Sequence, residues 1–345
     1  MNPSIILLLF SSLMLGTTIT ISSSHWLLAW AGLEMNTLAI IPIIAKQHHP
    51  RATEAATKYF LIQATASTLI LFSSTINAWK TGQWDISQMT TPASTTMLTL
   101  ALAMKLGLVP LHLWLPETLQ GSSLSTAMII TTWQKLAPTG LLLLTFNSLN
   151  HQILVTLGLA SALLGGWSGL NQTQTRKIMA FSSIAHMGWL FMALTISPNM
   201  TLLTLLIYLL LTSTLFSMLT ATSSKTLLDL GTTLHQTPSL LITSMLILMS
   251  LGGLPPLTGF MPKWLILSAL VTNDITLIST IMALSTLPSL FFYLRMSQMT
   301  TLTLPPKTTP TQHKWRFKTP TIPTTPMIIL STLLLPLTPL VSDLT

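Results

Sequence analysis

Four ionisable side chains lie deep inside long apolar stretches of a chain that is only 6% charged: Glu34, Lys105, Lys135 and Lys263. A buried amine holds its proton less tightly as it loses water and more tightly as a carboxylate approaches. Moving a carboxylate toward or away from a buried lysine therefore loads or releases a proton. These four residues predict a path for protons or cations through a membrane.

Glu34 lies in the apolar run WLLAWAGLEMNTLAIIPIIA, at a depth of about eight residues or ~12 Å at a rise of 1.5 Å per residue. An unpaired charge at that depth costs about 2.5–3.5 kcal/mol, so the carboxylate should meet a cation. Lys105 is the first candidate partner and Lys135 is its rival. A purely structural ion pair is the alternative interpretation.

An internal repeat surrounds two of the lysines. GLVPLHLWLPE at 107–117 and GLPPLTGFMPK at 253–263 share Gly, Leu, Pro, Leu and Pro at equivalent places. Lys105 precedes the first copy, and Lys263 ends the second. Prolines in mid-span remove backbone donors, so each copy predicts a broken helix. Paired broken helices, in halves of opposite orientation, are typical of transporters; simple kinks in lipid-facing helices are the alternative.

Two histidines are weaker candidates. His112 and His186 can relay protons near neutral pH, although a histidine bonded to a backbone carbonyl gives the same pattern. Glu117 is a minor candidate, because it occupies the position of Lys263 in the other repeat copy. The chain has no cysteine, which excludes disulfides and ordinary iron–sulfur clusters, and it has no Gly-x-Gly-x-x-Gly turn for a dinucleotide. We therefore expect no cofactor and no metal in this chain.

The elements that position these residues are transmembrane helices. Half of the residues are hydrophobic and the mean hydropathy is +0.67, whereas soluble domains carry about 25% charged residues. Apolar runs of about 20 residues recur along the chain and predict an all-α polytopic membrane protein. We predict about eleven spans, at 3–21, 24–45, 57–78, 95–119, 124–146, 152–170, 177–196, 200–222, 239–268, 275–296 and 322–341.

The distribution of basic residues predicts the orientation. With eleven spans, most lysines and arginines fall on the face that holds the loops at 46–54, 171–177, 223–230 and 305–318, whereas Lys80 falls on the other. The positive-inside rule then places the N-terminus on the cytoplasm-like side and the C-terminus opposite. The formal net charge of +8 is thus a topology signal. It predicts no nucleic-acid partner, because the charges are spread over separate short loops.

Five stretches together resemble the antiporter-like subunits of respiratory complex I over nearly the whole chain. They are SSHWLLAWAGLEMNTLAIIPI, EAATKYFLIQATAS from Glu54, MKLGLVPLHLWLPE from Met104, SSIAHMGW from Ser182 and GGLPPLTGFMPKW from Gly252. The resemblance implies a single antiporter-like membrane domain with two inverted five-helix repeats. The repeats would cover about 1–146 and 152–296, followed by a loop and last helix at about 297–345.

The resemblance also implies roles for the residues. Glu34 and Lys105 match the ion pair of the first half, Lys135 the central lysine, and Lys263 the residue that passes protons to a neighbouring subunit. The implied function is proton translocation in the membrane arm of NADH:ubiquinone oxidoreductase, with NADH, flavin, iron–sulfur clusters and ubiquinone in partner subunits. The implied location is the mitochondrial inner membrane, with the N-terminus in the matrix and the C-terminus in the intermembrane space. A stand-alone cation/proton antiporter and a passive scaffold are the alternatives.

Overall fold

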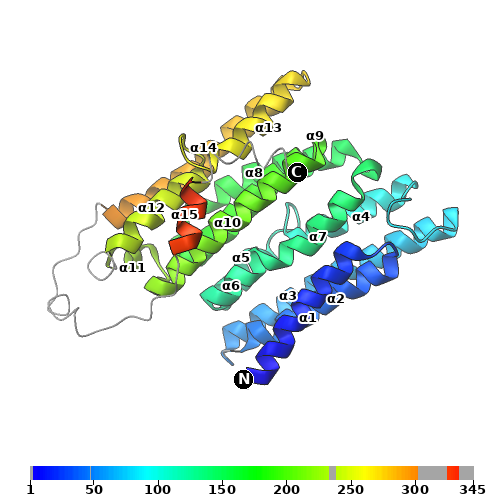
Figure 1. Ribbon diagram of the computed structural model, residues 1–345, viewed down its shortest axis with the longest axis horizontal. Coiled ribbons are helices and arrows are strands. Elements are labelled where there is room, and N and C mark those ends of the chain that lie inside the picture. The colour runs from blue at the N-terminus through cyan, green and yellow to red at the C-terminus, as the bar shows by residue number, and fades with distance from the viewer. Residues whose placement is uncertain (1–2, 47, 233–237, 302–324, 334–345) are drawn as a thin grey trace. The chain divides into compact units, whose positions relative to one another are not determined.

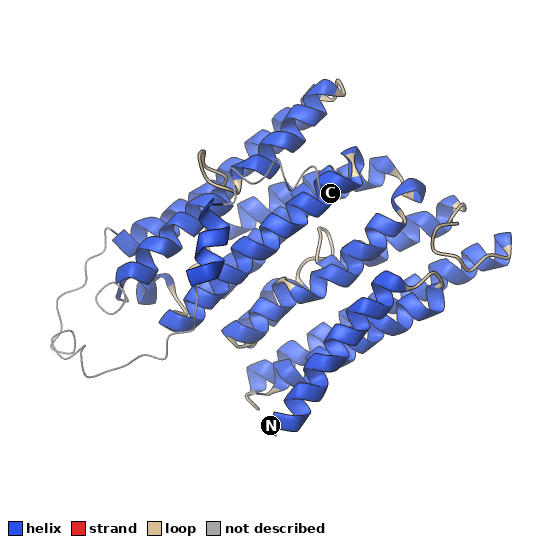
Figure 2. Cartoon of the chain, viewed as in Figure 1, coloured by secondary structure: helices blue, strands red, loops and turns tan. Residues whose placement is uncertain are grey.

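The computed structural model describes residues 3–46, 48–232, 238–301 and 325–333, and the chain in these ranges is helical with no β-strand (Figure 2). Seven helices in this part are long and apolar enough to cross a membrane, and two shorter helices are also apolar. The prediction of an all-α polytopic membrane protein is therefore confirmed. The predicted span at 322–341 is described only as the helix α15 (Thr325–Leu333), and the basic loop at 305–318 lies outside the described residues.

The chain divides into two compact units after Ser161. The helices of the first unit are α1 (Pro3–Ser22), α2 (Trp26–Ala45), α3 (Pro50–Thr81), α4 (Pro92–Leu106), α5 (Trp114–Gly121), α6 (Leu124–Thr131), α7 (Trp133–Leu144), the 3₁₀ turn η1 (Phe146–Ser148) and the start of α8 (His151–Gly169) (Figure 1). The second unit contains the rest of α8, then α9 (Thr175–Ile196), α10 (Pro198–Thr222), α11 (Leu227–Thr232), α12 (Pro238–Gly252), α13 (Phe260–Thr272), α14 (Thr276–Thr301) and α15. The inverted relation between the two predicted repeats stays a prediction.

In the first unit, small residues let α1 and α2 approach closely. A Cβ on Gly32 would lie 2.8 Å from the carbonyl oxygen of Gly16, so only glycine fits there. The long helix α3 packs against α2, α4 and α5, while α7 contacts α1, α2 and α4. This arrangement surrounds the end of α4, where Lys105 lies.

Both predicted helix breaks are present. The helix α4 ends at Gly107, whose φ of +77° favours glycine, and the chain resumes as α5 at Trp114. In the second unit, α12 ends at Gly253, with a φ of +82°, and α13 begins at Phe260. Pro110 and Pro256, at equivalent places in the two breaks, each follow a cis peptide bond. The repeated proline motif therefore predicted the breaks correctly.

One interruption was not expected from the sequence. The predicted span 124–146 is two helices that meet at Thr132, where α6 gives way to α7. The amide of Lys135 donates to the carbonyl of Thr132 at 3.3 Å, a tighter turn than the α-helical pattern. Pro138, inside α7, supplies no N–H to the ladder of this helix. The central lysine thus lies in the first turn of a new helix.

The second unit is built around α9. Most residues of α9 are buried, and this helix contacts α10, α13 and α14. The remainder of α8 packs on α9 through Gly165, whose Cβ would lie 2.7 Å from the backbone nitrogen of Ala185. At the second break, Gly259 passes so close to the Ser250 carbonyl that no larger residue fits. The two halves of this broken helix therefore touch through backbone.

Candidate proton-path site

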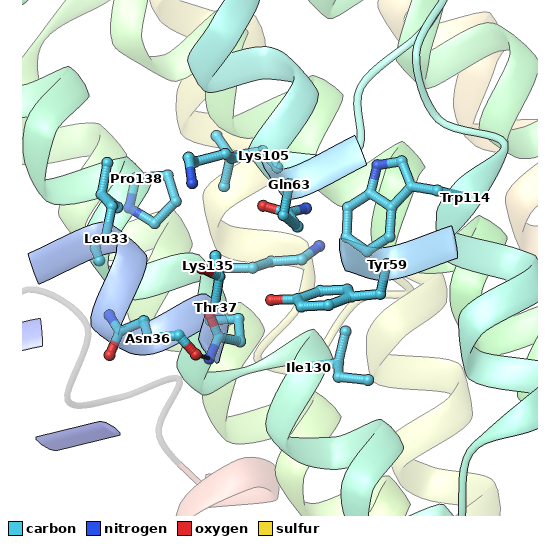
Figure 3. Close-up of a pocket in the computed structure, with 13 residues that line it drawn as sticks. Leu33, Asn36, Thr37, Tyr59, Gln63, Lys105, Trp114, Ile130, Lys135 and Pro138 are labelled. Atoms are coloured by element: carbon cyan, nitrogen blue, oxygen red, sulfur yellow. Dashed lines mark hydrogen bonds between the residues drawn. The ribbon is translucent and has the colours of Figure 1, made fainter. Parts of the chain in front are cut away.

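A small cavity in the first unit brings two of the predicted lysines together (Figure 3). It is lined by Leu33, Asn36, Thr37, Tyr59, Gln63, Lys105, Leu106, Trp114, Ile130, Gln134, Lys135, Ala137 and Pro138. The space open to the centre of a water molecule is about 10 Å³, which is close to what one water needs. Lys105 is 6% exposed and Lys135 is 2% exposed. The cavity is thus about large enough for one water molecule and has two amines in its wall.

Lys105 lies in the last turn of α4, directly before the first break. The C-terminal end of a helix carries a partial negative charge that favours a cation. The Nζ atom of Lys105 is buried and has no hydrogen-bond partner among the described residues. A buried ammonium without a direct partner is poorly suited to mere packing, because an unmade hydrogen bond to a charged group is costly.

Glu34 lies beside this cavity rather than in direct contact with Lys105. Its Oε2 accepts a hydrogen bond from Thr37 Oγ1 at 3.0 Å, and Thr37 lines the cavity. Among the described residues, no hydrogen bond joins Glu34 to Lys105. The depth of Glu34 in its span indicated a nearby cation, but depth alone could not show that Thr37, one turn later on the same helix, holds the carboxylate.

Lys135 extends across the cavity between Gln63 and Tyr59 (Figure 3). Its neighbour Gln134 donates from Nε2 to the carbonyl of Asn36 at 3.3 Å, which joins α7 to α2. The side chain of Lys135 therefore comes from a helix start that is fixed to the element carrying Glu34. The two predicted residues are held by adjacent, hydrogen-bonded elements.

Among the residues of the cavity wall that sequence reasoning missed are Tyr59, Gln63 and Trp114. Tyr59 and Gln63 are 1% and 4% exposed, and they lie one turn apart on α3. The ring of Tyr59 meets that of Trp114 edge-on, with centroids 5.7 Å apart. Trp114 Nε1 donates to the carbonyl of Met104 at 3.1 Å. The spacing of four residues between two polar side chains in an apolar helix was the available signal for Tyr59 and Gln63.

A second cavity lies within the second unit and contains Lys263 and His186. The space open to the centre of a water molecule is about 20 Å³, and the wall is formed by α9, α10, the end of the second break and the start of α13. Lys263 is 8% exposed. Its Nζ donates to the carbonyls of Gly252 at 2.9 Å and of Leu251 at 3.4 Å. The ammonium therefore caps the C-terminal end of α12 from the other side of the break.

The two predicted histidines differ in placement. His186 lines the second cavity, its Nε2 lies 3.3 Å from the hydroxyl of Tyr293, and its ring centroid lies 5.6 Å from that of Tyr208. His112 is half-buried in the first break, its Nδ1 has no hydrogen-bond partner among the described residues, and it is not part of the wall of the first cavity. The structure thus places His186, but not His112, in the wall of a cavity that also contains a lysine.

The polar side chains in the walls of both cavities are of types that can take part in proton transfer. Among the described residues, no three His, Asp or Glu side chains gather in a way that could hold a metal ion. The groups present are amines, an imidazole, hydroxyls and an amide, and all of these hold or pass a proton through hydrogen bonds. Each lysine lies next to a helix end inside a broken helix, where transporters bind ions.

Sequence comparisons identify the family of this chain. Residues 23–288 match the family described as NADH:quinone oxidoreductase/Mrp antiporter, and residues 290–342 match the NADH dehydrogenase subunit 2 C-terminus. NADH-ubiquinone oxidoreductase chain 2 of Struthio camelus is 55% identical over 99% of both chains, and that of Danio rerio is 54% identical over 100% of both. This chain belongs to the NADH-ubiquinone oxidoreductase chain 2 family. The family predicted from the sequence motifs is therefore confirmed.

Members of the wider antiporter-like group share the fold. A chain of respiratory complex I from Thermus thermophilus with bound aureothin superposes with a TM-score of 0.86 at 25% identity, covering 98% of this chain and 79% of that one. A chain of the Mrp complex from Dietzia sp. DQ12-45-1b gives 0.78 at 18% identity, covering 87% and 61%. The second likeness concerns the fold alone. Chain 2 proteins thus have the architecture of multi-pass antiporter-like subunits.

Proposed function

We propose that this chain translocates protons as a core membrane-arm subunit of an NADH:ubiquinone oxidoreductase. The observation that carries the proposal is that each of two buried cavities contains a lysine next to the end of a broken helix. Family membership supports the coupling to electron transfer from NADH to ubiquinone. The electron carriers, which are flavin and iron–sulfur clusters, belong to partner subunits, in keeping with the absence of cysteine in this chain.

At the first cavity, the two lysines in the wall are the proton holders and Glu34, beside the cavity, is the mobile charge. Movement of the Glu34 carboxylate toward Lys105 would stabilise the protonated amine, and movement away would favour release. Lys135 is the next acceptor in the same cavity. Moving one proton against 100 mV requires about 2.3 kcal/mol, which a change in the spacing of two charges in a medium of low dielectric constant readily supplies.

In the second cavity, Lys263 is the proton holder and His186 is the relay. The imidazole can accept a proton at one ring nitrogen and donate from the other, and Tyr293 contacts its Nε2. We assign Lys263 the transfer of protons toward a neighbouring antiporter-like subunit. His112 is a weaker candidate, because it lies outside the wall of the first cavity.

The proposed setting is the mitochondrial inner membrane, with the N-terminus in the matrix and the C-terminus in the intermembrane space. The names of the relatives given above support the location, and the distribution of basic residues supports the orientation. The partners are other membrane subunits of the same complex, including an antiporter-like neighbour, and membrane lipids. The large exposed apolar side chains on α1 and α2, such as Leu7 at 71% and Leu28 at 55%, are suited to contact with lipid or with another subunit.

The test is proton pumping against NADH oxidation in vesicles that contain the assembled parent complex. Lys105→Ala and Lys263→Ala should each lower the rate of pumping by about tenfold or more, because a positioned proton-transferring group contributes about 10²–10⁴-fold. Lys80→Ala, at the exposed end of α3, is the matched control and should pump normally. Normal pumping by the two cavity variants would favour the scaffold interpretation. Pumping that requires sodium would favour a cation/proton antiporter.

A further inference from the structure

The short helix α5 is attached to α3 by an exposed ion pair. Lys58 Nζ lies 2.7 Å from Glu117 Oε2, on α5, and 2.6 Å from Glu54 Oε1, one turn earlier on α3. Only the contact with Glu117 joins two different helices. At the other end of α5, a Cβ on Gly121 would lie 2.6 Å from the Cβ of Ala55. The second half of the first broken helix therefore rests closely on α3.

The first residue of α5, Trp114, forms part of the wall of the first cavity. Trp114, one turn before Glu117, meets the ring of Tyr59 at 5.7 Å. Tyr59 directly follows Lys58 in the chain, so adjacent residues of α3 contact two residues of α5, Trp114 and Glu117, that lie one turn apart near the same face of that helix. Trp114 also donates to Met104, the residue before Lys105. The ion pair and the cavity wall are thus connected through a single turn of α5.

The two repeat copies fix their breaks in different ways. Lys263 reaches back to the carbonyls of the first half-helix, whereas Glu117, at the equivalent position, points to Lys58 on a neighbouring helix. In the first copy, the contact across the break is made by Trp114 instead. The orientation of α5, which carries Trp114, therefore depends on what attaches α5 to α3.

An exposed ion pair adds little to the stability of a protein, and the side chains of Lys58 and Glu117 are 40% and 52% exposed. The value of this pair must then lie in its position. We propose that Lys58 and Glu117 form a positioning clamp, which holds α5 against α3 so that Trp114 and Tyr59 keep the cavity wall in place around Lys105 and Lys135. This inference rests on the proposed function of those lysines.

The experiment uses the assembled complex and a Glu54→Gln background, which removes the pair within α3 and leaves the clamp. In that background we compare Glu117→Lys, Lys58→Glu and the double exchange of the two charges. Each single change places like charges opposite each other, and the double change restores an ion pair of reversed polarity. The readouts are assembly, protons pumped per NADH oxidised, and the dependence of pumping on pH.

The Glu54→Gln background should behave as the native complex. Each single change should lower pumping by about tenfold, within the roughly 10²-fold that a 1 Å misplacement can cost, and should shift its pH profile while assembly is retained. The double exchange should restore both readouts. The milder change Glu117→Gln, in the native background, should lower pumping less than the charge reversals do. It should shift the pH profile in the same direction as they do, but by less.

Several outcomes would overturn the clamp. Equal pumping in the background and the single variants would make the pair an ordinary surface contact. A loss that the double exchange does not restore would mean that Glu117 acts by itself. A loss of assembly that the double exchange repairs, with a native pH profile in whatever complex forms, would show a structural role only. If Lys105→Ala also pumps normally, the proposed function has failed; if it does not, only the clamp has failed.

Discussion

At the scale of residues, a lysine next to a helix end is the feature common to both cavities. Lys105 lies in the final turn of α4, and Lys263 approaches the end of α12 from beyond the break. In both cases, the partial negative charge of the helix end offsets part of the cost of burying an ammonium. The same amino acid therefore reaches the same electrostatic environment from two different positions in the repeat.

Gly253 allows the contact between Lys263 and α12. Its φ is +82°, and a Cβ there would lie 2.9 Å from Lys263 Cδ. Gly253→Ala should therefore strain the backbone by about 1–2 kcal/mol and also displace the ammonium from the Gly252 carbonyl. We expect lower thermal stability together with impaired pumping, measured in the assembled complex.

Gly82→Ala is the matched control for this substitution. Gly82, the C-cap of α3, has a φ of +74°, and a Cβ there would meet nothing within 4 Å. Its replacement carries the same backbone strain without touching a cavity, so stability should fall by a similar amount while pumping is retained. Equal pumping by both variants would show that the lysine does not need its place at the helix end.

At the scale of elements, the breaks could be predicted from the sequence but their contacts could not. Proline removes a backbone donor wherever it stands, so the repeated motif sufficed to predict the breaks between α4 and α5 and between α12 and α13. The donors that satisfy the freed carbonyls, Trp114 and Lys263, lie ten and eleven residues after the carbonyls of Met104 and Gly252. Which side chain reaches the carbonyl of the first half-helix depends on the path of the loop between the two halves. No local sequence pattern specifies that path.

The interruption at Thr132 and the cavity wall escaped prediction for a related reason. Threonine is common in membrane helices. The hydroxyl of Thr132 donates to the carbonyl of Met128 at 2.6 Å, as threonines in helices often do. Tyr59 and Gln63 contribute to a water-sized space only because α3 packs against α4 and α5. The depth of the lysines in their spans predicted their burial correctly. Their contacts could not be predicted, because they depend on how the helices pack.

The helix α11 begins with a reciprocal cap that should depend on pH. Asp229 Oδ2 accepts from the amides of Thr226 at 2.9 Å and Lys225 at 3.1 Å, and Thr226 Oγ1 accepts from the amide of Asp229. Partial burial favours the neutral acid, but these donors outweigh it and lower the pKa of Asp229 below its ordinary value. Because the folded pKa is depressed, the cap contributes its full stability above the unfolded pKa and loses it as pH falls through the folded value.

Hydrogen exchange at the amides of Lys225 and Thr226 measures this cap. After correction for intrinsic exchange, protection should stay constant at neutral pH and decline only in acid. Asp229→Asn should lower protection at neutral pH, since a neutral amide is a weaker acceptor than a carboxylate, and the difference from the native chain should shrink in acid, where Asp229 is itself neutral. Protection that is independent of pH in the native chain would contradict the assigned role.

At the scale of the whole molecule, the orientation of the chain rests on its charge asymmetry. The absence of cysteine makes it possible to add single thiols to this chain and identify them by mass. We choose Thr53→Cys near the start of α3 and Ser87→Cys in the loop after it, since both positions are exposed. Thr53→Cys should react with an impermeant thiol reagent only from the matrix side, and Ser87→Cys only from the opposite side. Labelling of both from one side would show that α3 does not cross the membrane.

The cap on α12 gives the second break a stiffness that a proton can adjust. A protonated Lys263 holds the Gly252 carbonyl with both a hydrogen bond and a full positive charge. A neutral amine still donates a hydrogen bond but no longer attracts the helix end as a cation. Loss of the proton would therefore weaken the contact between α12 and α13 but keep one hydrogen bond between them. The rigidity of this broken helix would then depend on the charge of Lys263.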